Sequence, residues 1–215
     1  MSFFGAVEYA RSSHGQDLFI YGAFHEKWEE TDGIFVDVGA KDGIETSNTY
    51  LFEQFLGWKG ICFEPNPVSF FECKKNRKGP VYPIGIGKGG SCEFFCCPMG
   101  PGRSGIVENY HPEHTSFAMY LEHKSADNVI QIETAPLQKI LDIHGYRHIQ
   151  FLDVDTEGGE LEILKTIDYE KTQIDVINVE NLFSKEIMRE FLKEKGFLLF
   201  HEFAYDDLFV HRTFI

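Results

Sequence analysis

The chain has 215 residues, of which 43% are hydrophobic and 25% charged, and its formal net charge is −14. This length suits one domain, 1–215, with a sizeable hydrophobic core. Because nucleic-acid phosphates and anionic membranes attract basic surfaces, the acidic balance argues against a nucleic-acid partner or an anionic membrane surface. No apolar run is long enough to span a bilayer. The five cysteines form no disulfide-scaffold pattern, which predicts reduced thiols and a cytoplasmic location.

A buried strand that ends in a glycine-bearing turn is the main feature of the N-terminal third. The apolar run at 34–38 is typical of a strand covered on both faces, and Asp37 interrupts it with a carboxylate that needs partners. Gly39 and Gly43 allow a sharp turn or a close approach to a ligand. A helical pattern follows at 49–56. Strand, glycine turn and helix in this order present nucleotide-like ligands at the carboxyl edge of an open α/β sheet.

A second apolar strand, 60–63, ends in Glu64. A carboxylate about 20 residues after the glycine turn is placed to accept hydrogen bonds from a ribose diol. Asp37, Gly39 and Glu64 together therefore predict a bound nucleoside. The alternative is a structural βαβ unit whose acids only cap its turns.

The rest of the chain alternates between strand and helix patterns. Apolar or alternating runs predict strands at 81–84, 91–97, 129–134, 149–155 and 174–180. Capped or amphipathic runs predict helices at 67–76, 137–144, 158–167 and 185–195. The last two strands, 197–204 and 208–213, predict a hairpin. This order predicts an α/β fold with a mostly parallel sheet, an antiparallel C-terminal hairpin and helices on both faces.

Residues 98–128, within the stretch 91–133, are the least regular part of the chain, because glycines and prolines interrupt them. Long loops inside a compact domain are usually functional, so we expect an irregular lid or substrate-recognition insertion here. The preceding GIGKGG at 85–90 fits a G-x-G-x-x-G pattern, but a strand pattern follows it. Without a helix N-terminus to meet a pyrophosphate, it is interpreted as a turn before an antiparallel strand.

Four stretches, in matching order, resemble FkbM-type S-adenosylmethionine-dependent methyltransferases. They are FVDVGAKDG at 35–43, SNT at 47–49 with LGWKG and EPNP within 56–67, FLDVDTEGGELE at 151–162, and INVEN at 177–181. The resemblance implies a Rossmann-like class I methyltransferase fold with a seven-stranded sheet, and S-adenosylmethionine as the cofactor. It also implies cofactor contacts from the residues Asp37, Gly39, Ala40, Asp42, Gly43, Glu64, Pro65, Asn66 and Asp153.

Acidic residues gather at the ends of the strands predicted at 149–155 and 174–180, the fourth and fifth parallel strands. The carboxyl ends of these strands should share one edge of the sheet. Asp155 and Glu157 follow the fourth strand, and Glu180 and Asn181 end the fifth. This arrangement resembles the magnesium site of catechol-type O-methyltransferases, so Asp155, Glu180 and Asn181 are candidate ligands for Mg²⁺ or Mn²⁺. The alternative is a metal-free site in which Asp155, Glu157 or the loop residue His114 takes the acceptor's proton.

The resemblance implies O-methylation of a hydroxyl on a sugar, a glycan or a related polyol product. An acidic chain suits a small neutral polyol better than an anionic polymer. Two alternatives stay open: a lipid- or peptide-linked acceptor, and a degenerate methyltransferase fold that only binds the cofactor. Because little chain precedes the first strand, we also expect a larger polypeptide, fused to or working with a glycosyltransferase.

Overall fold

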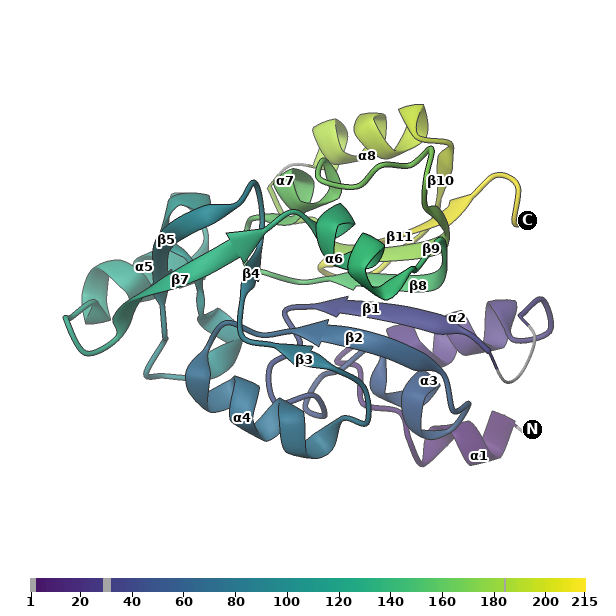
Figure 1. Cartoon of the computed structure of the whole chain (residues 1–215), viewed down its shortest axis with the longest axis horizontal. Helices are drawn as coiled ribbons and strands as arrows, with labels where there is room; N and C mark the ends of the chain where they lie inside the picture. Colours follow the sequence, from purple (N-terminus) through teal and green to yellow (C-terminus); the bar gives the residue numbers. More distant parts are fainter. Residues whose placement is uncertain (1–2, 29–31, 184) are drawn as a thin grey trace.

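The computed structural model describes residues 3–28, 32–183 and 185–215, and it contains a main sheet and a smaller one (Figure 1). The main sheet is seven-stranded, in the order β10-β11-β9-β8-β1-β2-β3. Its strands are β1 (Ile34–Val38), β2 (Lys59–Phe63), β3 (Val81–Tyr82), β8 (His148–Val154), β9 (Gln173–Glu180), β10 (Phe197–Glu202) and β11 (Asp206–His211). All neighbours from β3 to β9 pair in parallel, whereas β11 is antiparallel to β9 and β10. The predicted sheet and closing hairpin are confirmed.

Helices cover both faces of the main sheet, as predicted (Figure 1). One face carries α6 (Leu137–His144), α7 (Glu160–Leu164) and α8 (Lys185–Glu194). The other face carries α1 (Phe3–Val7), α2 (Gln16–Phe24), α3 (Tyr50–Gln54) and α4 (Pro67–Asn76). The start of α4 shows why its bounds were predictable: Asn66 Oδ1 accepts the Val68 amide, and Pro67 suits the first helical position.

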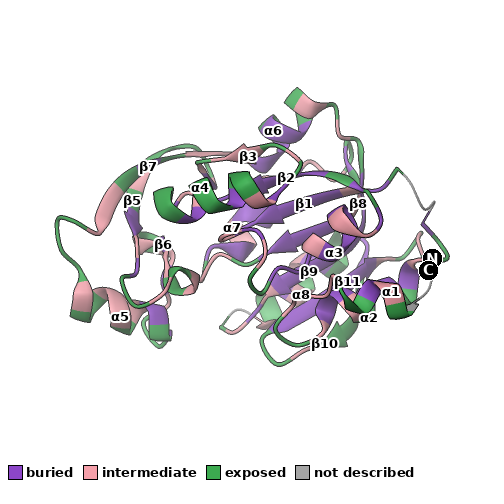
Figure 2. Cartoon of the chain, turned by 90° about the horizontal axis from the view of Figure 1, so that it is seen from below, coloured by how far each residue is buried: buried purple, intermediate pink, exposed green. Residues whose placement is uncertain are grey.

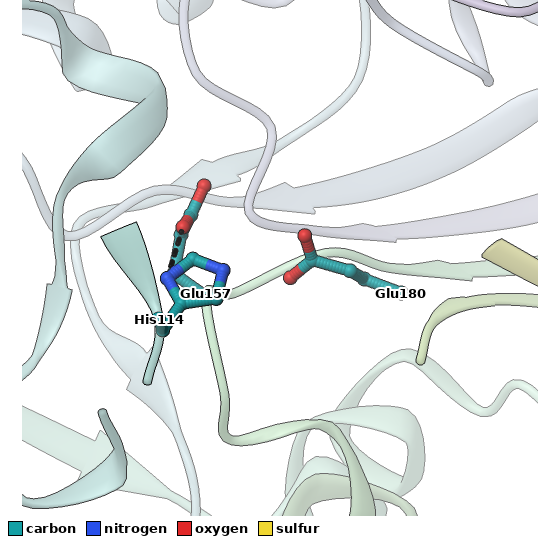
Figure 3. A group of neighbouring side chains, drawn as sticks. All are labelled: His114, Glu157 and Glu180. Atoms are coloured by element: carbon teal, nitrogen blue, oxygen red, sulfur yellow. Dashed lines mark ion pairs between the residues drawn. The ribbon is translucent and has the colours of Figure 1, made fainter. Parts of the chain in front are cut away.

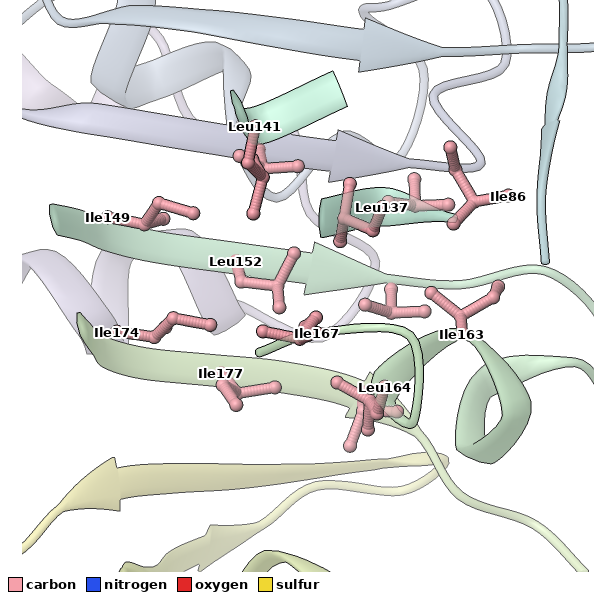
Figure 4. Packing of buried hydrophobic residues seen from close by; sticks show 14 of the residues in the cluster. Ile86, Leu137, Leu141, Ile149, Leu152, Ile163, Leu164, Ile167, Ile174 and Ile177 are labelled. Atoms are coloured by element: carbon pink, nitrogen blue, oxygen red, sulfur yellow. The ribbon is translucent and has the colours of Figure 1, made fainter. Parts of the chain in front are cut away.

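Side chains of the central strands alternate between two buried clusters. Val36 and Leu152 belong to the cluster under α6 and α7 (Figure 4), whereas Phe35 and Phe151 belong to the aromatic cluster under α2 and α3. Because both faces are covered, these strands read as continuous apolar runs. The alternation also determines where polar strand residues point. Positions that share the parity of Phe35 and Phe151 face the helices α1 to α4.

The predicted insertion contains a second sheet, which includes the strands predicted at 91–97 and 129–134, and its role as a lid or substrate-recognition insertion stays a prediction. The four strands of this sheet, in the order β4-β7-β5-β6, are β4 (Gly85–Ile86), β5 (Gly90–Phe95), β6 (Gly105–Ile106) and β7 (Val129–Ala135). The connections hold η1 (Pro101–Arg103), η2 (Val107–Asn109) and α5 (Thr115–His123). β5 pairs antiparallel with β7, which confirms the predicted turn and antiparallel strand. Figures 1 and 2 show this small sheet and α5 beyond the carboxyl ends of β1 and β2, with more exposed surface than the main sheet.

Two expectations about the chain as a whole can be compared with the structure. Among the described residues, none of the helices combines the length and the apolar composition that crossing a membrane requires. The five cysteines are free thiols, as predicted. The cytoplasmic location stays a prediction.

Candidate functional site

A cavity of about 800 Å³ lies at the carboxyl ends of the parallel strands, between the main sheet and the small sheet. Its walls come from the turns after β1 and β2, the loops after β8 and β9, and the η1–α5 part of the insertion. Its size falls within the range of about 300–1,000 Å³ typical of small-molecule sites. A smaller cavity of about 210 Å³ shares His114, Glu157 and Glu180 with it.

Gly39, on the cavity wall, is the residue of the first turn that cannot carry a side chain. Its φ is 96°, and a Cβ there would lie 1.8 Å from the carbonyl oxygen of Asp155. The backbone after β1 therefore approaches the loop after β8 as closely as glycine allows. This contact is the structural reason for the glycine that the sequence singled out.

Glu64 lies on the cavity wall beside Pro65 and is held by the backbone around it. Its Oε2 accepts the Lys41 amide at 2.8 Å, and its Oε1 accepts the Asn66 amide at 2.7 Å. Burial raises the pKa of Glu64 to about 7. Each oxygen keeps a second lone pair, so the carboxylate can still accept hydroxyl groups of a ligand.

Asp37 and Asp153 face the helices of the opposite side and do not line either cavity. Thr49 Oγ1 donates to Asp37 at 2.5 Å, and Arg77 Nη1 lies 3.3 Å from the same carboxylate. Asp153 accepts from the side-chain amides of Asn48 and Asn178, at 3.0 Å and 2.9 Å. The two aspartates share the parity of Phe35 and Phe151, which explains why neither reaches the cavity beside Glu64.

The other predicted cofactor residues shape the turns behind the cavity wall. Ala40 is buried, and Gly43, with φ 80°, packs against Arg77. Asp42 Oδ1 accepts the amides of residues 44 and 45, which closes the turn. Asn66 caps α4. None of these four lines the cavity as Glu64 and Pro65 do, so a role for them in cofactor binding stays a prediction.

Acidic side chains line the part of the cavity formed by the loops after β8 and β9. Asp155, Glu157 and Glu180 lie there with His114, which comes from the residue before α5. Ligand atoms of His114, Glu157 and Glu180 lie within 4.8 Å of one another (Figure 3). No described lysine or arginine forms an ion pair with any of the three acids. We call Asp155, Glu157 and Glu180 the acidic edge.

Burial and mutual repulsion raise the pKa of every carboxyl in the acidic edge. Burial, opposed by a hydrogen bond from Ser116, raises the pKa of Glu157 to about 7. Burial, followed by repulsion from Asp155, raises that of Glu180 to about 11. Burial among protein atoms, followed by repulsion from Glu157, also raises the pKa of Asp155. Its side chain is nevertheless exposed to the open cavity, and the water there moderates the shift. At neutral pH the edge therefore holds protons that ordinary carboxylates would release.

Ser116 is the site residue that the sequence did not indicate. It is fully buried; its Oγ donates to Glu157 Oε2 at 2.5 Å, and its backbone N–H donates to His114 Nδ1 at 3.1 Å. The contact with Glu157 spans 41 positions of the chain, and no local pattern marks it. Burial, with positive charge from Arg103, lowers the pKa of His114, so the ring is neutral at neutral pH.

The structure also brings together a group of potential metal ligands that differs from the sequence-predicted set. Among the described residues, that group is His114, Glu157 and Glu180, and it shares only Glu180 with the predicted set. Asn181 is buried, and its amide nitrogen donates to Asp207 at 2.7 Å. Two neighbouring acids make structural contacts instead. Glu160 accepts backbone amides of its own loop, and Glu162 pairs with lysines at the surface.

Comparison with known proteins gives the fold and the family. The FkbM methyltransferase from Methylobacillus flagellatus KT is 15% identical, with a TM-score of 0.51, over 98% of this chain and 50% of that one. A METTL16 MTase domain is 13% identical, with a TM-score of 0.50, over 91% and 65%. These likenesses show the fold alone, and the chain spans half to two thirds of those structures' length. No curated protein sequence matches significantly.

The family model described as "Methyltransferase FkbM domain" matches residues 37–199, which is more than half of the chain. The match begins at the first strand's aspartate and includes Glu64, the insertion and the acidic edge. It agrees with the class I methyltransferase-like sheet and with a cavity at the sheet's carboxyl edge. The chain belongs to the FkbM family of S-adenosylmethionine-dependent methyltransferases.

Proposed function

We propose that the chain is an O-methyltransferase that uses S-adenosylmethionine and acts on a hydroxyl of a sugar, a glycan or a related polyol. The observation that supports this is one cavity lined both by Glu64 and by the acidic edge. When bound, S-adenosylmethionine supplies a methyl group on a sulfonium, an electrophile for the acceptor oxygen. Glu64 would accept the ribose hydroxyls, and Lys41, also on the wall, would pair with the methionine carboxylate.

Glu157 is the proposed general base. Ser116 Oγ occupies its Oε2, and no described residue donates to its Oε1, which is left to take the acceptor's proton. Its pKa of about 7 suits a base that works near neutral pH, because the ionised form is then populated and still binds a proton well. As the acceptor oxygen takes the methyl group, the O–H bond breaks and the proton moves to Oε1. The neighbouring carboxyl groups of Glu180 and Asp155 form hydrogen bonds with the other hydroxyl groups of the methyl acceptor.

The walls of the cavity favour a polyol over an anionic acceptor. Among the described residues, six carboxyl groups line it against two cations, Lys41 and Arg103, and the rings of Phe183 and Tyr205 line it as well. The six are Glu45, Glu64, Glu113, Asp155, Glu157 and Glu180. Carboxylates bind the hydroxyl groups of a sugar as acceptors, and rings cover its apolar face. Phosphates would be repelled, so we propose no nucleic-acid acceptor. A lipid- or peptide-linked hydroxyl would meet the same walls and stays the second candidate.

Mass-spectrometric assay of methyl transfer to a panel of nucleotide sugars and short glycans tests this function. Calorimetry with S-adenosylhomocysteine on the same preparations reports the cofactor site independently. Glu157→Gln is expected to lower turnover by about 10²- to 10⁴-fold while S-adenosylhomocysteine still binds. Ser91→Ala, on an exposed strand of the small sheet, is the control and should match the wild type. Binding without transfer to any acceptor would favour the degenerate, cofactor-binding alternative, and no binding would remove both enzyme and binding functions.

A further inference from the structure

Ser116 joins the insertion to the acidic edge through its hydroxyl, and its backbone holds a neighbouring residue of the insertion. Its hydroxyl donates to Glu157, and its backbone N–H donates to His114. Glu157 has a left-handed φ of 65°, which a residue with a side chain adopts at a cost unless its surroundings hold it there. A fully buried hydroxyl that meets this carboxylate at 2.5 Å is such a holding contact.

The hydroxyl bond makes the two oxygens of Glu157 unequal. Oε2 accepts from Ser116, whereas Oε1 has no donor among the described residues. The carboxylate therefore presents one defined oxygen to the cavity rather than two that exchange.

The backbone bond determines which nitrogen of His114 carries the proton. Nδ1 accepts the Ser116 amide, so in the neutral ring the proton is assigned to Nε2 from this hydrogen bond. Figure 3 shows the other ring nitrogen on the side of Glu180. His114 is thereby a hydrogen-bond donor toward the acidic edge, not a second base.

We propose that Ser116 is a positioning residue for methyl transfer: it fixes Glu157 with Oε1 toward the acceptor hydroxyl and fixes His114 as an Nε2–H donor toward Glu180. The inference rests on the proposed role of Glu157 as the base. It gives the insertion a part in the chemistry, because α5 carries the residue that orients a base on the loop after β8. The insertion is then more than a cover for the acceptor.

The test is a titration of the Glu157 carboxyl by ¹³C NMR on the whole chain with S-adenosylhomocysteine present. Ser116→Ala is expected to raise the Glu157 titration midpoint by about one to two pH units, since a hydrogen bond to the charged form lowers a pKa. Its turnover should fall without a change in KM, and the acid limb of its pH profile should move up equally. The other charged or titratable groups around Glu157 stay the same in this comparison: Lys41, Arg103, Tyr110, His114, Asp155, Glu160 and Glu180.

Ser116→Thr and Ser116→Val form the matched pair, because they have the same shape and differ only in the hydroxyl. Thr should restore the wild-type midpoint and Val should behave as Ala, and this pair replaces Ala if the smaller residue fails to fold. An unchanged midpoint in Val or Ala would overturn the proposal. If the midpoint shifts but Glu157→Gln keeps full turnover, the failure lies in the base assignment, and the positioning role is overturned with it.

Discussion

Two groups of carboxylates are buried against the main sheet, and they differ in whether a cation balances them. In the core group, Arg77 lies 2.7 Å from Glu53 and 3.3 Å from Asp37, and all three side chains are at most 3% exposed. The remaining oxygen of Glu53 accepts two backbone amides. In the acidic edge, no described lysine or arginine pairs with Glu157 or its neighbours.

The difference separates structure from function. Buried charges that serve only the fold are paired and hydrogen-bonded, because an unpaired buried charge costs stability. The acidic edge keeps that cost, and perturbed carboxyl groups in a cavity are typical of chemical sites. Asp37, in β1, belongs to the core group, whereas the acids at the carboxyl ends of β8 and β9 belong to the acidic edge.

The largest expected effect is on the core group. Arg77→Met should lower the free energy of unfolding by about 3 to 5 kcal/mol, because it leaves Asp37 and Glu53 buried without a cation. Urea denaturation measures it. The matched control is Lys75→Met, which removes an exposed pair with Glu72 on the same helix and should change stability by less than about 0.5 kcal/mol. A loss below about 1 kcal/mol for Arg77→Met would mean that other contacts hold the two acids.

Glu64 has one property of each group. Backbone amides hold its carboxylate, as in the core group, and it lines the cavity, as the acidic edge does. Glu64→Ala should weaken S-adenosylhomocysteine binding by about 30- to 1,000-fold, the loss of about 2 to 4 kcal/mol expected for two charge-assisted bonds to the ribose. The ionised carboxylate is the better acceptor, so wild-type affinity should decrease as pH falls below about 7. Calorimetry between pH 6 and 8 measures both. Glu72→Ala, exposed on α4, is the control, and equal affinity in the two variants would make Glu64 a capping acid only.

The acidic edge should destabilise the chain as pH rises. The folded pKa of Glu157 is about 7 against an ordinary 4.5, so the folded chain binds more protons than the unfolded chain between these values. Stability therefore falls as pH rises through this window and levels off above it. Glu157→Gln should remove about 2 to 3 kcal/mol of the difference in unfolding free energy between pH 5 and 8. An equal pH dependence in both chains would show that Glu157 titrates normally.

The main sheet was predictable because its signals are local. Apolar runs, Asn66 before Pro67 and the glycine turn each depend on neighbours in the sequence. Two strands of the small sheet were predicted for the same reason, but their pairing with each other was not, because it joins distant parts of the chain: Gly90 lies opposite Thr134, and the glycines and prolines between them indicate only interruption. A period-two pattern shows that the side chains of a strand alternate between its two faces. It does not show which helix layer each of the two faces packs against.

The same reasoning applies to the site. Glu64 and the acidic edge were found because strand ends collect ligands, and this rule needs only strand order. Asp37 was expected at the cofactor because it precedes the glycine turn, and Asp153 because of the family resemblance. Their partners Arg77 and Asn178 come from other elements, and nothing in the sequence links them. Ser116 was missed for the same reason.

The smallest effect is expected from metal ions. The sequence-predicted set of Asp155, Glu180 and Asn181 is divided between the two cavities, because Asp155 lines only the larger one and Asn181 only the smaller one. The group that the structure brings together would need His114, whose Nδ1 already accepts the Ser116 amide. Neither set is preorganised, so millimolar Mg²⁺ or Mn²⁺ should raise the melting temperature by less than about 1 °C, and EDTA should leave turnover unchanged. Loss of turnover on chelation, restored by Mn²⁺, would contradict this. Asp155→Ala and His114→Ala would then decide between the two sets: loss of rescue in the first alone restores the sequence-predicted site, and in the second alone assigns the ion to the group in Figure 3.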